Sequence, residues 1–228
     1  MKSTQLLRPA QHTEYQLLTS ILNGTHPPGS ALPNERSLAM HLGITRPTLR
    51  EALQRMAREG WITIQHGKAT MVNDYALDGG MGMLTTLSAH PEFLPAAYIL
   101  HFLEVRLVLL PEVAGMAAEK APETLLRHLS RHEQLNDDKE SFAEFDWQLQ
   151  LLMATHSGNP IFRLIVNDFS QLFKTMAPAY FAMDDARRAS TGYYQALSRF
   201  ITGNDREKVV AIVRSAMRDA MVRWKQMK

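Results

Sequence analysis

The sequence predicts a mainly α-helical protein, with an N-terminal winged helix-turn-helix followed by an all-α antiparallel helical bundle. Two short amphipathic segments meet at Gly43 and are followed by two β-type runs, the order of a winged helix-turn-helix. Beyond about residue 80, apolar residues keep helical spacing and no useful strand pattern returns. The 228 residues leave room for two modest domains. We expect a winged helix-turn-helix domain at 1–73, a linker at 74–80 and a helical domain at 81–228.

The chain begins with a predicted helix that runs from about Pro9 and ends at Asn23-Gly24. Its apolar residues recur at helical spacing and should form the buried stripe: Tyr15, Leu18, Ile21 and Leu22. A proline-rich turn at 27–33 follows, because prolines block helix, and Leu32 is expected to enter the core.

A second short helix is predicted from Asn34 to Leu42. Asn34 is a favoured N-cap residue, and Leu38 and Leu42 share the inward face. Gly43 follows at the point where a tight turn needs a positive φ. This segment therefore supplies the first helix of the helix-turn-helix.

The third helix is predicted to begin after Thr45 and to end at Gly60. Thr45 is its N-cap, and Pro47 lies in the first turn, where its missing N–H costs nothing. One face carries the apolar residues expected to contact the core: Leu49, Leu53 and Met56. The helix should start cleanly, with its partial positive end exposed.

The opposite face of this third helix gathers cationic and hydroxyl side chains near its N-terminal end: Thr45, Arg46, Thr48 and Arg50. A DNA major groove admits one helix whose first turns offer Arg to guanine edges and phosphates. An ordinary amphipathic helix with a solvated face shows the same residues, but the flanking helix and wing favour DNA. Arg36, on the second helix, either contacts a phosphate or forms a surface ion pair with Glu35 or Glu51.

The two β-type runs, 61–64 and 69–72, are joined by Gln65-His66-Gly67-Lys68. We expect a two-stranded wing whose basic tip reaches a minor groove or phosphates. The charge distribution agrees: residues 1–74 carry 8 Lys+Arg and 5 Asp+Glu, whereas 75–228 carry 17 and 18. A basic head on a near-neutral body suits a protein that contacts a polyanion through one end.

Asn73 to Gly80 break every periodicity and form the clearest linker signal. The predicted bundle helices follow at about 81–89, 93–120, 122–135, 139–156, 160–182, 184–203 and 205–228. Short connections between them imply antiparallel neighbours. Several of these helices are rich in aromatic residues and methionines, which form either plain core or the walls of an apolar ligand cavity. The methionines are Met153, Met176, Met183, Met217 and Met221.

The sequence contains no cysteine, which excludes disulfides and thiolate metal sites and agrees with a reducing cytosol. It has no signal-peptide core at its N-terminus and no run near the roughly 20 apolar residues of a membrane span. We expect a soluble, cytoplasmic protein without a membrane partner.

Three stretches of the head resemble the GntR family of winged-helix transcription regulators: 32–36, 45–53 and 60–68. Further stretches resemble the effector domain of its FadR subfamily, the fatty acid metabolism regulators: 143–146, 157–161, 180–182, 186–194 and Trp224. The resemblance covers nearly the whole chain, and its DNA-binding motif is the more specific part.

The resemblance implies a homodimeric transcription factor, not an enzyme, that binds a pseudo-palindromic operator. Such regulators repress fatty acid degradation genes, activate unsaturated fatty acid synthesis genes and release DNA when long-chain acyl-CoA, an effector rather than a cofactor, occupies the bundle. The resemblance implies that the DNA contacts of the family fall on Arg36, Thr45, Arg46, Thr48, Arg50, His66 and Gly67. At Pro47 some relatives have a hydroxyl residue that also touches DNA, so that contact is absent here.

The resemblance also implies ligand contacts in the bundle, at Arg106, Tyr194 and Trp224. We expect surface cations near the phosphate-bearing end of acyl-CoA. The candidates are Arg106, Arg214 and Arg218. Alternatively, Arg106 forms an intra-bundle ion pair with Asp146. The family pattern has small residues where this chain has Met217 and Ala220. Met217 would narrow the cavity, which leaves the identity and chain length of the effector open.

Two other kinds of site are conceivable. Another branch of the GntR family senses small carboxylic acids with a metal held by one Asp and three His. Asp146 is present, but the histidine positions hold Gln150, a Tyr of the 193–194 pair and Arg218, so no metal site is predicted. His128 and His132 could hold a metal in an enzyme, yet the zinc-protease Glu is missing and a solvated helix face is the simpler interpretation. We predict no catalytic residues.

Overall fold

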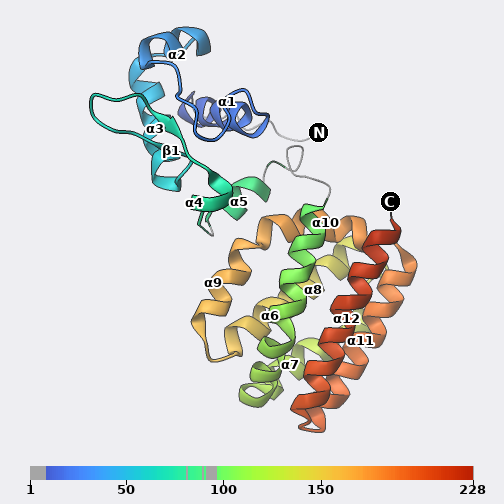
Figure 1. Ribbon diagram of the computed structural model, residues 1–228. Coiled ribbons are helices and arrows are strands. Elements are labelled where there is room, and N and C mark those ends of the chain that lie inside the picture. The colour runs from blue at the N-terminus through green and yellow to red at the C-terminus, as the bar shows by residue number, and fades with distance from the viewer. Residues whose placement is uncertain (1–8, 81, 89, 91–96, 228) are drawn as a thin grey trace. The chain divides into compact units, whose positions relative to one another are not determined.

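The protein is described here by a computed structural model that covers residues 9–80, 82–88, 90 and 97–227. It consists of helices and one small antiparallel sheet, which confirms the predicted fold class (Figure 1). The chain divides into two compact units, Met1–Phe93 and Leu94–Lys228. Within the described residues, none of the helices is both long and apolar enough to span a membrane.

The first unit contains the predicted helix-turn-helix. Its elements are α1 (Pro9–Leu22), α2 (Glu35–Leu42), α3 (Arg46–Glu59), β1 (Ile62–Thr63), β2 (Met71–Val72), α4 (Tyr75–Asp78) and α5 (Gly82–Ser88). The side chain of Asn34 caps α2 by accepting from the Ser37 N–H at 2.9 Å. Gly43 ends α2 with φ 66° and Gly60 ends α3 with φ 90°, both left-handed conformations that favour glycine. These capping signals place both helices where the sequence predicts them.

The core of the first unit contains the predicted residues of α3: Leu49, Leu53 and Met56. The stripe predicted for α1 is partly wrong, because Tyr15 is 41% exposed and Leu22 is only half-buried. Leu17 takes a buried place together with Leu18 and Ile21. The ring of Tyr15 lies instead beside His90, with the ring centroids 5.0 Å apart.

The wing is shorter than predicted, since each strand has two residues. Ile62 pairs with Val72 and Thr63 with Met71. Trp61, which the sequence placed in the first strand, instead donates its N–H to the Met56 carbonyl at the end of α3. Residues 29–32 run along the other side of the second strand, where the Leu32 N–H donates to the Thr70 carbonyl at 2.8 Å. The turn before α2 thereby joins the wing to the helices.

The predicted linker is partly helical and packs with the first unit. Asp74 caps α4 by accepting from the Ala76 N–H at 3.0 Å. The ring of Tyr75 packs against Trp61, with centroids 5.4 Å apart, and Met83 of α5 is buried. These contacts place the boundary between the compact units after residue 93, later than the predicted start of the helical domain at residue 81.

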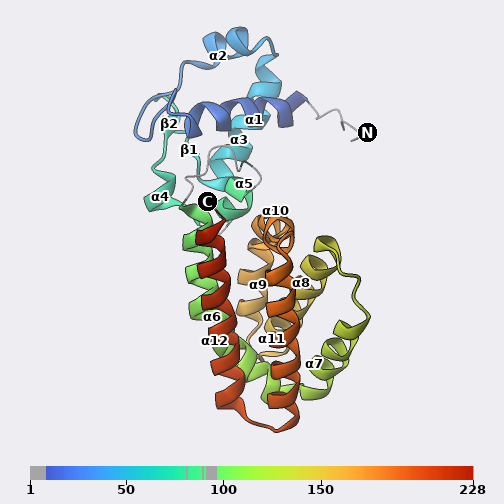
Figure 2. The same ribbon diagram turned by 90° about the vertical axis from the view of Figure 1, so that its right-hand side faces the viewer.

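The second unit is a bundle of antiparallel helices. They are α6 (Tyr98–Lys120), α7 (Pro122–Leu129), the 3-10 helix η2 (Ser130–Gln134), α8 (Lys139–His156), α9 (Pro160–Asp168), α10 (Ser170–Phe181), α11 (Asp184–Thr202) and α12 (Arg206–Gln226). The long helices α6 and α12 lie side by side along the bundle, and α11 packs next to α12 (Figures 1 and 2). The predicted helix ends at Met81, Ala89, 93–96 and Lys228 lie outside the described residues.

Two predicted bundle helices are divided in the structure. The segment 122–135 leaves the α-helical conformation after Leu129, where His132 Nδ1 binds the Leu129 carbonyl at 2.7 Å. Such side-chain bonds compete with the helical pattern of main-chain bonds. The segment 160–182 breaks at Phe169, whose φ of −81° and ψ of −5° lie in the bridge region. Phe169 is buried and its ring packs edge-on against Phe102.

Candidate DNA-binding and ligand sites

The N-terminal end of α3 presents two arginines to solvent. The side chains of Arg46 and Arg50 are each 57% exposed and lie one turn apart. Thr45 caps the helix by accepting from the Thr48 N–H at 3.4 Å, and the two hydroxyl oxygens are 2.9 Å apart. The predicted hydroxyl and cationic residues of α3 therefore gather at one exposed helix end that carries a partial positive charge.

One carboxylate lies against both arginines. Glu35 Oε2, on the first residue of α2, is 2.8 Å from Arg50 Nε and 3.5 Å from Arg46 Nη2. Arg36 is exposed and makes no ion pair with Glu35 or Glu51 among the residues described; Glu51 pairs with Arg55. The surface ion pair considered for Arg36 is therefore absent, and its guanidinium faces solvent.

The tip of the wing is a basic, exposed turn. The Lys68 N–H donates to the Gln65 carbonyl at 3.1 Å, and Gly67 has φ 70°. His66, Gly67 and Lys68 are all exposed. The turn can thus bring an imidazole, main-chain N–H groups and an ammonium group to a polyanion.

The bundle encloses a cavity of about 140 Å³ between α6, α10, α11 and α12. Its walls combine the apolar residues Phe173, Met176, Phe181 and Met217 with polar groups on α6, α8, α11 and α12. The polar wall residues include Arg106, Asp146, Ser190, Tyr193, Asp219 and Arg223. Of the predicted methionines, Met176 and Met217 line the cavity, whereas Met153 is buried in the core.

Arg106 and Asp146 form a buried ion pair at the cavity wall. Arg106 Nη2 is 3.7 Å from Asp146 Oδ2, and Gln150 and Tyr194 donate to the same carboxylate at 2.7 and 3.2 Å. Burial raises the pKa of Asp146, while the Arg106 charge opposes this shift. Arg106 Nε is buried without a hydrogen-bond partner, and the guanidinium lies 5.4 Å from the centroid of Phe173. The cavity wall therefore includes a buried guanidinium with one donor that has no hydrogen-bond partner.

Only part of the predicted ligand set lines this cavity. Arg106 and Met217 do, but Arg106 is buried, so its interpretation as a surface cation is wrong. Tyr194 is fully buried behind the wall, and its neighbour Tyr193 lines the cavity, because successive helical residues point about 100° apart. Trp224 is buried and is not among the lining residues.

Arg223 is the cation of α12 that lines the cavity, and the sequence analysis missed it. Arg214 pairs with Glu112 at 3.3 Å and Arg218 is exposed, and neither lines the cavity. Arg223 lines it, and its Nε binds Asp185 at 3.1 Å. The available signal was the spacing of Ala216, Ala220 and Arg223, which places them on one face of α12.

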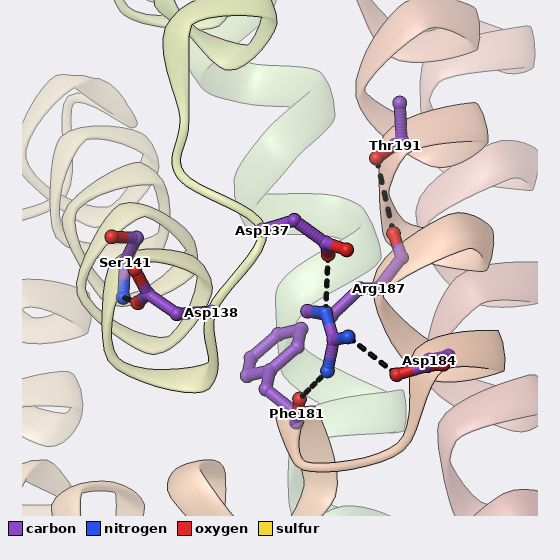
Figure 3. A network of polar contacts seen from close by, with 7 residues as sticks. All are labelled: Asp137, Asp138, Ser141, Phe181, Asp184, Arg187 and Thr191. Carbon is purple, nitrogen blue, oxygen red and sulfur yellow. Dashed lines mark hydrogen bonds and ion pairs between the residues drawn. The ribbon is translucent and has the colours of Figure 1, made fainter.

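A network around Arg187 holds one end of the cavity wall in place (Figure 3). Arg187 donates to Asp137 and Asp184 at 2.5 Å and to the Phe181 carbonyl at 2.7 Å. The turn from α10 to α11 is thereby attached to the segment before α8. Because Phe181 lines the cavity, this network fixes the helix that carries part of its apolar wall.

Two family models together match residues 9–228 of the chain. Residues 9–72 match the family described as bacterial regulatory proteins, gntR family, and residues 73–228 match the FadR C-terminal domain. The chain belongs to the FadR subfamily of the GntR family. As a member of this family it is a DNA-binding transcription regulator and not an enzyme.

Similar curated proteins are named fatty acid metabolism regulator protein. The one from Shewanella pealeana is 36% identical over 221 residues, covering 96% of this chain and 92% of the relative. The one from Klebsiella pneumoniae is 36% identical over 219 residues, with the same coverage. A solved structure titled "Lar controls the expression of the Listeria monocytogenes agr system and mediates virulence" has a TM-score of 0.64 at 16% identity. It covers 99% of this chain and 100% of that chain, and this likeness concerns the fold alone.

In this GntR-family chain, the residues at the positions considered for a metal site make other contacts. Gln150 donates to Asp146, and the positive charge beside that carboxylate is Arg106. Arg218 points to solvent. Within the described residues no three His, Cys, Asp or Glu side chains gather at one place.

His128 and His132 do not form the solvated face that the sequence analysis favoured. Both are half-buried, and each binds a main-chain carbonyl: His128 Nε2 that of Phe145 at 3.1 Å, and His132 Nδ1 that of Leu129. The His128 ring also stacks on Phe145, with centroids 4.2 Å apart. The i, i+4 spacing therefore reflects packing of α7 and η2 onto the bundle.

Proposed function

We propose that this protein regulates genes of fatty acid metabolism by binding a pseudo-palindromic operator as a homodimer and leaving it when an acyl-CoA occupies the bundle. The observation that carries the proposal is the exposed pair of arginines, Arg46 and Arg50, at the N-terminus of α3. The relatives of this chain are named fatty acid metabolism regulator protein. Repression of degradation genes and activation of unsaturated fatty acid synthesis genes belong to the same proposal. Action on DNA places the protein in the cytoplasm.

DNA binding would use α3 in the major groove and the wing beside it. Arg46 and Arg50 would reach guanine edges or phosphates, with Thr45 and Thr48 on adjacent backbone positions. Arg36 has an exposed guanidinium on α2 that suits a phosphate. The proposed wing contacts are His66 and Gly67. Pro47 occupies a first-turn position without a hydroxyl, so the side-chain contact that the resemblance implies for some relatives is not available here.

A homodimer would place two recognition helices on one operator. A two-fold protein requires half-sites related by the same symmetry, which gives the pseudo-palindrome. Sedimentation at micromolar concentration should give a dimer, and titration should give two chains per operator. A monomer that binds as one chain per operator would contradict this part of the proposal.

The effector would enter the cavity with its tail between Met176, Met217 and the aromatic wall. Since Arg106 is buried, we propose that it binds the polar carbonyl end of the acyl group inside the bundle, whereas Arg223 meets the phosphate-bearing end at the mouth. The cavity of about 140 Å³ is smaller than the roughly 300–1,000 Å³ typical of ligand pockets. A long chain therefore requires the methionine side chains to rotate, which their flexibility allows.

Ligand binding can release DNA only by favouring a state that binds DNA less well. A coupling of about 1–3 kcal/mol would weaken operator binding about 5- to 150-fold. We propose that the segment from Asn73 to Gly80 and α5 transmit this change, because they join the helix-turn-helix to the bundle in the sequence.

A small carboxylate is a second candidate effector. It is favoured by the small volume of the cavity and by the unpartnered Arg106 Nε in its wall. A carboxylate accepts hydrogen bonds from a guanidinium with good geometry. Such a ligand would need no movement of Met217.

Mass spectrometry of ligand retained by the purified protein, followed by gel shift with and without that ligand, tests the proposal. Calorimetry with acyl-CoAs of increasing length should show binding, and Met217→Gly should enlarge the cavity and strengthen binding of longer chains. Heat from small carboxylates alone would favour the second candidate. No heat from any acyl-CoA, with an unchanged gel shift, would contradict acyl-CoA as effector.

A further inference from the structure

Glu35 is an acidic residue within the cationic surface proposed to bind DNA. Its carboxylate is 35% exposed, less than the 57% of either arginine that it contacts. It sits at the first position of α2, where the helix N-terminus favours a negative charge. The cap bond from Asn34 to Ser37 fixes the start of that helix. The Glu35 side chain is therefore held in place beside Arg46 and Arg50.

The geometry of the pair with Arg50 leaves the end of the guanidinium available. Glu35 Oε2 accepts from Arg50 Nε at 2.8 Å, on the side of the fork nearest the helix. Among the described residues, Glu35 is the only carboxylate that pairs with Arg50, and the Arg50 side chain is 57% exposed. Arginine recognises guanine through two parallel N–H groups of this fork. A carboxylate on Nε can orient the fork without occupying all of its donors.

The same carboxylate reduces the net charge of the surface. Arg36, Arg46 and Arg50 are exposed cations of α2 and α3, and Glu35 neutralises one of their three charges. Attraction to phosphate is independent of sequence and grows with the number of cations that replace counterions. An acidic residue therefore weakens binding to every DNA, whereas alignment of Arg50 strengthens binding only where a guanine is in place.

We infer that Glu35 is a specificity-determining residue, which positions Arg50 for base recognition and lowers the affinity of the surface for DNA of any sequence. This inference rests on the proposed function, because it requires that Arg50 faces the operator. Glu35 acts through the arginines and needs no DNA contact of its own.

The test separates charge from position. Glu35→Gln removes the charge and keeps an oxygen acceptor, whereas Glu35→Asp keeps the charge and shortens the reach to Arg50. Glu51→Gln is the matched control, since Glu51 is an exposed acid of α3 that pairs with Arg55 instead. The affinity of each protein is measured for an operator duplex, selected from a random library by the unaltered protein, and for a scrambled duplex across a range of salt.

We expect Glu35→Gln to bind the scrambled duplex about tenfold more tightly at 0.1 M salt, with a log–log salt slope steeper by about one. Its preference for the operator should fall about tenfold. Glu35→Asp should keep the weak scrambled binding and lose operator affinity, and Glu51→Gln should keep the preference of the unaltered protein. Thermal melting checks that each variant is folded.

Two outcomes would overturn the inference in distinguishable ways. If the unaltered protein discriminates between the duplexes and Glu35→Gln changes both affinities by one common factor, Glu35 has no role in specificity although the protein binds DNA. If the unaltered protein binds neither duplex, the proposed DNA-binding surface itself is wrong, and the inference fails with it.

Discussion

The two units use the same ion pair, arginine with carboxylate, in opposite environments. On the first unit, Glu35 pairs with Arg46 and Arg50 at the surface, where the arginine side chains are 57% exposed. In the bundle, Arg106 and Asp146 are 8% and 12% exposed. A surface pair contributes little to stability and can exchange its partner for phosphate or a base. A buried pair cannot lose one member without leaving a charge in an apolar surrounding. The first pair suits recognition of DNA, and the second fixes the wall of a cavity.

The strongest test of this contrast removes one member of the buried pair. Asp146→Ala leaves the Arg106 guanidinium without its counter-charge, so we expect the free energy of unfolding to fall by about 3–5 kcal/mol. Urea unfolding followed by the helical circular dichroism signal measures it. Glu144→Ala is the control, because Glu144 is exposed on the same helix and should change stability by less than about 0.5 kcal/mol. Equal losses in the two variants would contradict the importance of the buried pair.

The second prediction concerns the surface arginines. Arg46→Ala and Arg50→Ala should each weaken operator binding by about 1–3 kcal/mol, because each removes a base or phosphate contact. Unfolding free energy should stay within about 0.5 kcal/mol of the unaltered protein. Arg58→Ala changes the same charge on an exposed residue at the other end of α3 and serves as the control. Gel shift at two salt concentrations measures the operator affinity of all three variants. Equal losses of affinity in the three would contradict the proposed placement of α3 on DNA.

The contrast also explains what the sequence could predict. In the first unit, each functional residue lies within a few positions of its own structural signal: Thr45 caps the helix that carries Arg46 and Arg50, and Gly67 forms the turn that carries His66. Local signals of this kind are read directly from the chain. The predicted residues of α3 therefore lie together at one exposed helix end, and His66 and Gly67 lie on the exposed turn of the wing, although each wing strand is shorter than predicted.

The bundle cavity depends on contacts between residues far apart in the chain. Arg106 and Asp146 are 40 positions apart, and Asp146 and Tyr194 are joined by a hydrogen bond across 48. The resemblance implied a ligand contact at Tyr194, whereas its neighbour Tyr193 lines the cavity. Arg214 does not line the cavity and pairs instead with Glu112, which lies 102 positions away on α6. No local pattern encodes these pairings.

A third arginine, of intermediate burial, sharpens the comparison. Arg187 is 11% exposed but pairs with two exposed carboxylates and one main-chain carbonyl (Figure 3). Arg187→Ala should lower the free energy of unfolding by less than Asp146→Ala does, mostly through loss of the charged bond to the Phe181 carbonyl. Arg188→Ala, at an exposed neighbouring position, should change it by less than about 0.5 kcal/mol. A loss as large as that of Asp146→Ala would show that exposed acids can matter as much as buried ones.

The smallest expected effect is the pH response of His128, a half-buried group of the bundle. Burial lowers its pKa below 6.5, the bond to the Phe145 carbonyl and the charge of Asp146 oppose this, and Arg131 adds to it. Because the folded pKa lies below the unfolded one, the unfolded chain takes up the proton first as pH falls. The stability due to neutral His128 is therefore fully present above about pH 6.5 and is lost as pH falls through the folded pKa.

His128→Gln removes this titration, so the free energy of unfolding should decline less between pH 7 and 5 than in the unaltered protein. The difference should stay below about 1 kcal/mol, because solvent screens a half-buried ring. His101→Gln, at an exposed position of α6, is the control and should retain the full decline. Urea unfolding at several pH values measures both variants. If His128→Gln loses as much stability toward acid as the control does, the acid response of the bundle arises from other groups. Asp146 is not one of them, because its raised carboxyl pKa favours the folded state as pH falls.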